Sequence, residues 1–124
     1  MNDAIAKELS KDPDGLLTYE YIANNINNCA EDIDYLVDNM IAVDKSGQFV
    51  VSAARYLNAI DSEGFGAAIR RLVAAAIEKD RERRYLGDLL TSLYGADYNE
   101  RAQQLSATDD NFRRIYKRLY PSGI

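Results

Sequence analysis

Apolar residues recur at helical spacing along almost the whole of this 124-residue chain, and this periodicity constrains the fold more than any other feature. An apolar stripe that repeats every three to four residues belongs to an amphipathic helix, which buries that stripe against another element. The two clearest stripes are Ile69, Leu72, Val73, Ala76 and Ile77, and then Leu86, Leu89, Leu90, Leu93 and Tyr94. The pattern predicts a mostly α fold of about six helices.

The two stripes cannot lie on one straight helix. A helix over residues 63–94 would be about 48 Å long at 1.5 Å per residue, which exceeds the width of a domain of this size. We therefore expect a break within 79–87, a segment rich in charged residues. A last helix is predicted over 109–120, with Pro121 as its stop.

One segment departs from the helical pattern. The turn-forming run 44–48 leads into Phe49, Val50 and Val51, an aromatic residue and two β-branched residues that favour a strand. We therefore expect one short β-hairpin or strand near residues 44–52.

The length and composition are those of one ordinary domain. Hydrophobic residues make up 47% of the chain and charged residues 28%, which is typical of globular proteins. The length suits one compact domain and is too short for two. No internal repeat stands out, and no linker is long enough to divide the chain. We expect residues 1–124 to form a single all-helical domain.

The composition excludes most familiar catalytic sites. The chain has no histidine and only one cysteine, Cys29. It therefore lacks a Ser-His-Asp or Cys-His nucleophile, an imidazole general base and a Cys/His zinc site. We expect no enzyme activity, no cofactor, no metal and no small-molecule ligand.

The same features predict a cytoplasmic protein. A lone cysteine cannot form an internal disulfide, which suits a reducing compartment. The first residues contain no apolar signal-peptide core. The longest apolar run, Leu72 to Ile77, has six residues and is far shorter than the ~20 that cross a bilayer. We expect no membrane contact.

Charge is distributed unevenly along the chain. Residues 1–61 carry eleven acids and four bases, a net charge of −7, whereas residues 62–124 carry nine acids and eleven bases, a net charge of +2. Nucleic-acid binding needs a basic surface, so the overall charge of −5 argues against it. The asymmetry favours attraction between the halves, within one fold or across a dimer, and leaves open two surfaces for two partners.

The segment from Ser10 to Tyr21 resembles an EF-hand calcium loop, with Asp12, Asp14 and Gly15 at its third, fifth and sixth positions. The family requires a bidentate glutamate at the twelfth position, where this chain has Tyr21. We therefore predict a turn followed by a helix, without calcium binding.

A longer segment, from Leu17 to Leu57, looks like a winged-helix module. The resemblance implies a recognition helix over 30–42 and a wing at Ser46-Gly47. The family places basic and polar residues on that helix to contact DNA. Here its exposed positions would carry Glu31, Asp32, Asp34, Asp38 and Asn39. The alternative hypothesis is a winged-helix-like regulatory protein whose acidic helix contacts protein rather than DNA.

The last predicted helix carries the strongest candidate site. Its apolar face would contain Phe112, Ile115, Tyr116, Leu119 and Tyr120. The other face would present two basic rows at i,i+4 spacing, 113/117 and 114/118. Cations near a helix C-terminus also favour the helix dipole, so this face could equally be a solvated one.

Our leading hypothesis is a non-enzymatic protein–protein interaction or assembly module, whose partner is another protein or a second copy of the chain. The sequence has nine tyrosines and no tryptophan, and tyrosine is common both at the rims of small cores and in interfaces. We expect Tyr116 and Tyr120 to be the aromatic anchors. Arg113, Lys117 and Arg118 would form the polar rim.

Overall fold

The computed structural model describes residues 1–121, which contain eight α-helices, one 3₁₀ turn and no strand. The elements are α1 (Asp3–Ser10), α2 (Leu16–Asn24), η1 (Ala30–Asp32), α3 (Ile33–Val43), α4 (Gln48–Asp61), α5 (Gly66–Lys79), α6 (Leu86–Tyr94), α7 (Ala102–Thr108) and α8 (Asp110–Leu119). The mostly α class is confirmed, with more helices than the six expected. Residues 122–124 of the predicted domain lie outside the described residues.

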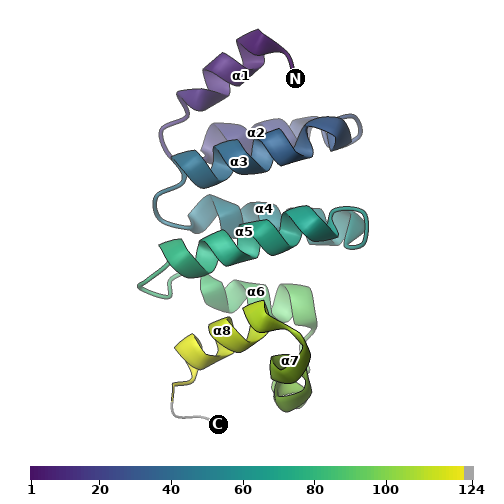
Figure 1. The fold of residues 1–124 in the computed structure, drawn as a ribbon, viewed down its shortest axis with the longest axis vertical. Helices are drawn as coiled ribbons and strands as arrows, with labels where there is room; N and C mark the ends of the chain where they lie inside the picture. The colour runs from purple at the N-terminus through teal and green to yellow at the C-terminus, as the bar shows by residue number, and fades with distance from the viewer. Residues whose placement is uncertain (122–124) are drawn as a thin grey trace.

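The helices form an elongated stack of hairpins in two rows (Figure 1). α2 pairs with α3, α4 with α5, and α6 with α8. Within one row α2, α4 and α6 contact in turn, and within the other row α3, α5 and α8 do the same. α1 packs on α3 at one end, and α7 packs on α8 at the other. Each hairpin thus contacts mainly its neighbours, as in repeat proteins.

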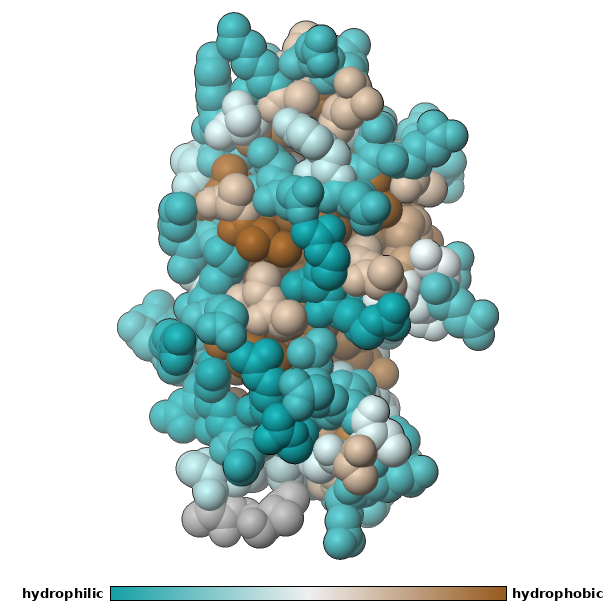
Figure 2. All heavy atoms as spheres, viewed as in Figure 1, coloured by the Kyte–Doolittle hydropathy of each residue, from teal (hydrophilic) through white to brown (hydrophobic). Residues whose placement is uncertain are grey.

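The buried side chains lie between the two rows. Each of α3, α4, α5, α6 and α8 contributes fully buried residues, among them Leu36, Leu57, Leu72, Leu89 and Phe112. Figure 2 shows hydrophilic residues over most of one face, with hydrophobic residues visible mainly in the middle of the stack. The buried residues of these helices belong to one hydrophobic cluster.

The predicted strand near residues 44–52 is wrong, because these residues form a turn and the first part of α4. Val50 and Val51 are buried together with Ala53, Ala54 and Leu57, a spacing that fits one face of a helix. Burying this helix face stabilises the segment more than the β propensity of the two valines would stabilise a strand. Ser46-Gly47 leads into α4 and forms no wing, so the winged-helix arrangement is also wrong.

The predicted helix ends in the second half are confirmed. α5 ends at Lys79 and α6 begins at Leu86, which places the break inside the charged segment. The last helix begins after Asp109, whose carboxylate accepts a hydrogen bond from the backbone N–H of Phe112 at 3.0 Å. This is a side-chain N-cap.

Three buried aspartates, Asp12, Asp44 and Asp80, precede the three helices of one row, α2, α4 and α6. The Asp44 carboxylate accepts the backbone N–H groups of Gly47, Phe49 and Val50, each at 2.9 Å. These donors have no partner within the helix, so the aspartate satisfies them.

Asp12 and Asp80 make equivalent bonds. Asp12 accepts the N–H groups of Gly15 and Thr18 at 2.9 and 2.8 Å, and Asp80 accepts those of Tyr85 and Leu86 at 2.7 and 2.9 Å. Burial opposes ionisation of Asp12, but the hydrogen bonds from Thr18 and Gly15 outweigh it and lower its pKa. This carboxylate therefore contributes stability that is lost when the pH falls through its lowered pKa.

A left-handed backbone position lies three residues after each aspartate, at Gly15 (φ 108°), Gly47 (φ 94°) and Arg83 (φ 60°). The two glycines also allow close contact between successive turns. A Cβ on Gly15 would lie 3.3 Å from the Cβ of Asp44, and one on Gly47 would lie 3.1 Å from that of Asp80. The three turns therefore stack along one edge of the molecule.

This edge is an internal repeat that the sequence analysis missed. The aspartates at 12, 44 and 80 lie 32 and 36 residues apart. The aspartate and the left-handed position recur in all three turns, but the third turn has arginine where the others have glycine. The repeat is therefore recognised from the backbone conformation of the three turns more readily than from their residue types.

Replacing Asp44 with alanine should lower the free energy of unfolding by about 3 kcal/mol, because several buried N–H groups lose their acceptor. Urea unfolding followed by circular dichroism measures the change. Asp34→Ala is the control, since Asp34 is exposed in the first turn of α3 and its loss should cost less than about 0.5 kcal/mol. Equal losses in the two variants would contradict the role of the buried aspartate.

Replacing Arg83 with glycine should raise the free energy of unfolding by about 0.5–1 kcal/mol, because glycine adopts a positive φ without steric cost. Arg84→Gly should instead destabilise the protein, since Arg84 does not have a positive φ. Thermal unfolding of both variants beside the wild type is the measurement. A stabilisation by Arg84→Gly of the same size would show that conformation at position 83 is not the cause.

Candidate protein-interaction surface

A small hollow lies at the C-terminal end of the stack, between α7 and the last turns of α8. Its volume is about 170 Å³, and it is lined by Ser106, Arg113, Tyr116, Lys117, Tyr120 and Pro121. Four of the five site residues predicted from the sequence therefore line one hollow. We call it the tail hollow.

Stacked aromatic rings form one wall of the tail hollow. The ring of Tyr116 stacks on that of Phe112, with centroids 5.4 Å apart and an interplanar angle of 22°. The ring of Tyr120 lies 4.6 Å from that of Tyr116. Tyr116 is 8% exposed and Tyr120 is 37% exposed. The buried ring of Tyr116 thus packs beneath the more exposed ring of Tyr120.

Hydrogen bonds hold both tyrosines in place. The hydroxyl of Tyr116 donates to Oδ1 of Asn99 at 2.5 Å. The hydroxyls of Tyr120 and Tyr98 share a hydrogen bond of 3.0 Å, which raises the pKa of Tyr98 to about 12. The hydroxyls of Tyr116 and Tyr120 thus both have hydrogen-bond partners within the chain, which order the two rings.

Two cations lie beside the rings. The guanidinium of Arg113 donates to Oδ1 of Asp110 from Nε at 3.2 Å and from Nη at 2.5 Å, and it holds the pKa of Asp110 below its ordinary value. Lys117 is exposed and forms no ion pair with any of residues 1–121. The tail hollow thus combines aromatic surface with positive charge.

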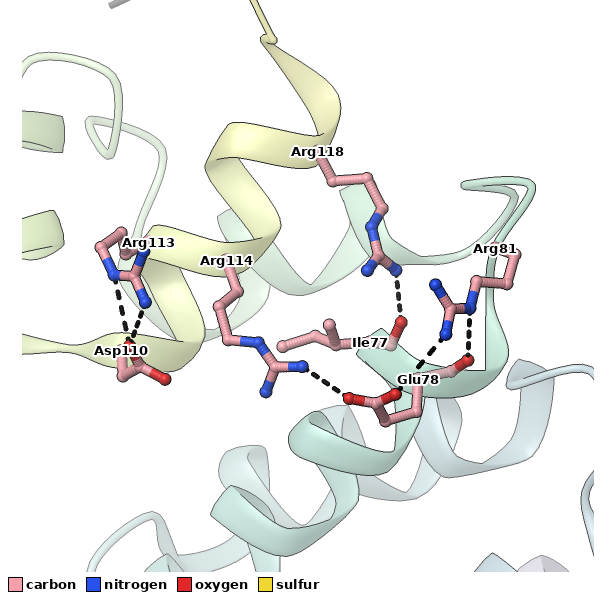
Figure 3. Close-up of polar contacts among 7 residues, drawn as sticks. All are labelled: Ile77, Glu78, Arg81, Asp110, Arg113, Arg114 and Arg118. Atoms are coloured by element: carbon pink, nitrogen blue, oxygen red, sulfur yellow. Dashed lines mark hydrogen bonds and ion pairs between the residues drawn. The ribbon is translucent and has the colours of Figure 1, made fainter.

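The fifth predicted residue, Arg118, lies on a different side of α8 (Figure 3). Its guanidinium donates to the backbone carbonyl of Ile77, near the end of α5. Arg114 donates to Oε1 of Glu78 at 2.6 Å, and this bond is the main reason that the pKa of Glu78 is lowered. The 114/118 row therefore joins α8 to α5, and only the 113/117 row lines the tail hollow.

A second hollow, missed by the sequence analysis, lies at the opposite end of the stack. Its volume is about 260 Å³, and α1 and α2 line it, with Ile5, Leu17 and Tyr21 among the apolar residues and Glu8 and Glu20 among the polar ones. We call it the head hollow. The sequence signal was the pair Leu16-Leu17 after a turn, whose side chains are both more than 40% exposed.

The remaining sequence features are accounted for locally. Cys29 is buried, and burial raises the pKa of its thiol. Asp38, on the acidic face of α3, pairs with Arg71 of α5. Within residues 1–121, no three His, Cys, Asp or Glu side chains are grouped as a metal site would require.

No helix in the described part of the chain is long and apolar enough to cross a bilayer. No protein-family model, curated protein or solved structure matches the chain.

The two tyrosines of the tail hollow should respond differently to truncation. Tyr116→Ala should lower the free energy of unfolding by about 3 kcal/mol, because it removes a buried ring and its hydrogen bond. Tyr120→Ala should cost about 1 kcal/mol or less, since that ring is partly exposed. Urea unfolding compares them. A loss as large for Tyr120 as for Tyr116 would mean that both rings belong to the core.

Proposed function

We propose that this chain is a non-enzymatic, cytoplasmic protein–protein interaction module, and that the tail hollow is its contact surface. One observation carries the proposal. Tyr116 and Tyr120, held by stacking and hydrogen bonds, line an open hollow at the end of the stack beside Arg113 and Lys117.

The residue types support a protein contact. Tyrosine and arginine are enriched in interfaces, and they dominate the binding energy of many complexes. The rings of Tyr116 and Tyr120 are already ordered, so binding costs little side-chain entropy.

The size of the hollow supports the same class of partner. Pockets for small molecules commonly have volumes of about 300–1,000 Å³. The tail hollow, at about 170 Å³, suits one side chain of a protein partner. The cations Arg113 and Lys117 favour a partner with carboxylates around that side chain.

Photo-crosslinking in cells tests this proposal. A photoreactive phenylalanine analogue in place of Tyr120 should form covalent adducts with a protein, and mass spectrometry of the adduct identifies the residue reached. The control carries the same analogue in place of Ile60, which is 50% exposed on α4 and does not line the tail hollow. Adducts that are absent at Tyr120, or no more frequent there than at Ile60, would refute the proposal.

A further inference from the structure

The two ends of the stack carry opposite charge. Residues 1–43, which form α1 to α3 at one end, contain nine acids and two bases, a net charge of −7. Residues 101–121, which include α7 and α8 at the other end, contain two acids and five bases, a net charge of +3. Because the stack is elongated, these charges lie far apart in one copy and cannot neutralise each other across it (Figure 1).

Each end also leaves apolar surface uncovered. At the N-terminal end, Leu17 lines the head hollow and is 49% exposed, with Leu16 beside it. At the C-terminal end, Tyr120 is 37% exposed at the tail hollow. A stack of hairpins usually ends in elements with a polar outer face, because a terminal hairpin has only one neighbour. The apolar groups at the two hollows therefore make both ends candidate contact surfaces.

The charges around the two hollows are complementary. Glu8 and Glu20, both exposed, line the head hollow with the apolar residues. Lys117 and Arg113 are both exposed and line the tail hollow with the tyrosines, and Arg113 also pairs with Asp110. Each hollow therefore offers the apolar and charged groups that the other would need in a partner.

We propose that copies of this chain associate end to end, with the head hollow of one copy against the tail hollow of the next, and with Glu8 and Glu20 facing Arg113 and Lys117. This inference rests on the proposed function and names its partner as a second copy. The contact joins two different surfaces of the chain, so each copy keeps one free head and one free tail. Association is therefore open-ended and forms short rows of copies, or a ring where the rotation between copies closes.

The charges make this association sensitive to salt. Raising the ionic strength from about 0.1 M to about 1 M shortens the Debye length from about 10 Å to about 3 Å, which weakens attraction between exposed charges. We expect a weak affinity, with a dissociation constant in the range from about 1 μM to about 1 mM. The mean mass of the wild type should therefore rise with protein concentration at low salt and fall again at high salt.

The decisive experiment uses one variant for each end. The head variant carries Glu8→Lys and Glu20→Lys, and the tail variant carries Arg113→Glu and Lys117→Glu. Each changes one hollow to the charge of the other, so each alone should remain monomeric by sedimentation velocity at concentrations where the wild type associates. An equimolar mixture should associate again, because the unchanged tail of the head variant meets the unchanged head of the tail variant, and the two reversed hollows also carry opposite charges.

A matched control separates local contact from net charge. Arg81→Glu with Arg84→Glu changes the net charge by the same amount as the tail variant, but in the turn between α5 and α6. At about 0.1 M salt this control should associate with less than a threefold change in dissociation constant, because exposed charges more than a Debye length of about 10 Å from the contact are largely screened. Circular dichroism checks that all variants fold. If a reversal variant unfolds, glutamine at the same positions replaces it.

Three results would overturn the inference. They are a wild type that stays monomeric at about 1 mM and low salt, a head variant that still dimerises by itself, and a mixture of the two variants that stays monomeric.

The crosslinking experiment at Tyr120 distinguishes failure of the end-to-end contact from failure of the proposed function. Adducts with a different protein, beside a monomeric wild type, would leave the interaction module standing without the end-to-end contact. A monomeric wild type without specific adducts would refute both.

Discussion

A buried aspartate carboxylate before the first turn of a helix is the interaction on which this architecture depends. Asp12, Asp44 and Asp80 each bind backbone N–H groups that a helix start leaves without partners. Each therefore determines where its helix begins and how the chain enters it. Because Gly15 and Gly47 carry no side chain, each turn also packs directly on the next. The hydrogen bonds thus direct the chain within a turn, and the contacts between turns set the spacing of the hairpins.

An architecture built this way has two ends, and the ends differ. Neighbouring hairpins cover one another, so interior side chains such as Leu57 and Leu72 have no contact with solvent. The first and last elements lack one neighbour, and apolar groups such as Leu17 and Tyr120 stay partly exposed there. The acidic residues gather at one end and the basic residues of α8 at the other. The two contact surfaces that we propose therefore lie at the ends of the stack.

Much of the fold could be predicted because helical periodicity is a local property. The break between Lys79 and Leu86 followed from length, and the start of α8 followed from Asp109. The segment around Val50 could not be predicted, since its residue types favour a strand while Asp44 and the neighbouring helices favour a helix. The repeat was hidden for a related reason. It consists of a backbone conformation that glycine and Arg83 both adopt, and residue types alone do not display it.

The candidate surface shows the same division. From the sequence alone, spacing placed two basic rows and an aromatic face on the last helix, because side chains three and four residues apart share a face. Only the tertiary structure decided which row is free. Arg118 reaches the carbonyl of Ile77, whereas Lys117 lies at the tail hollow, because α5 packs against one side of α8 only. Likewise, Tyr116 is buried and Tyr120 exposed because the stack ends there. Helical periodicity in the sequence determines which side chains share a face of a helix. The packing of neighbouring helices determines which of those side chains remain accessible to solvent.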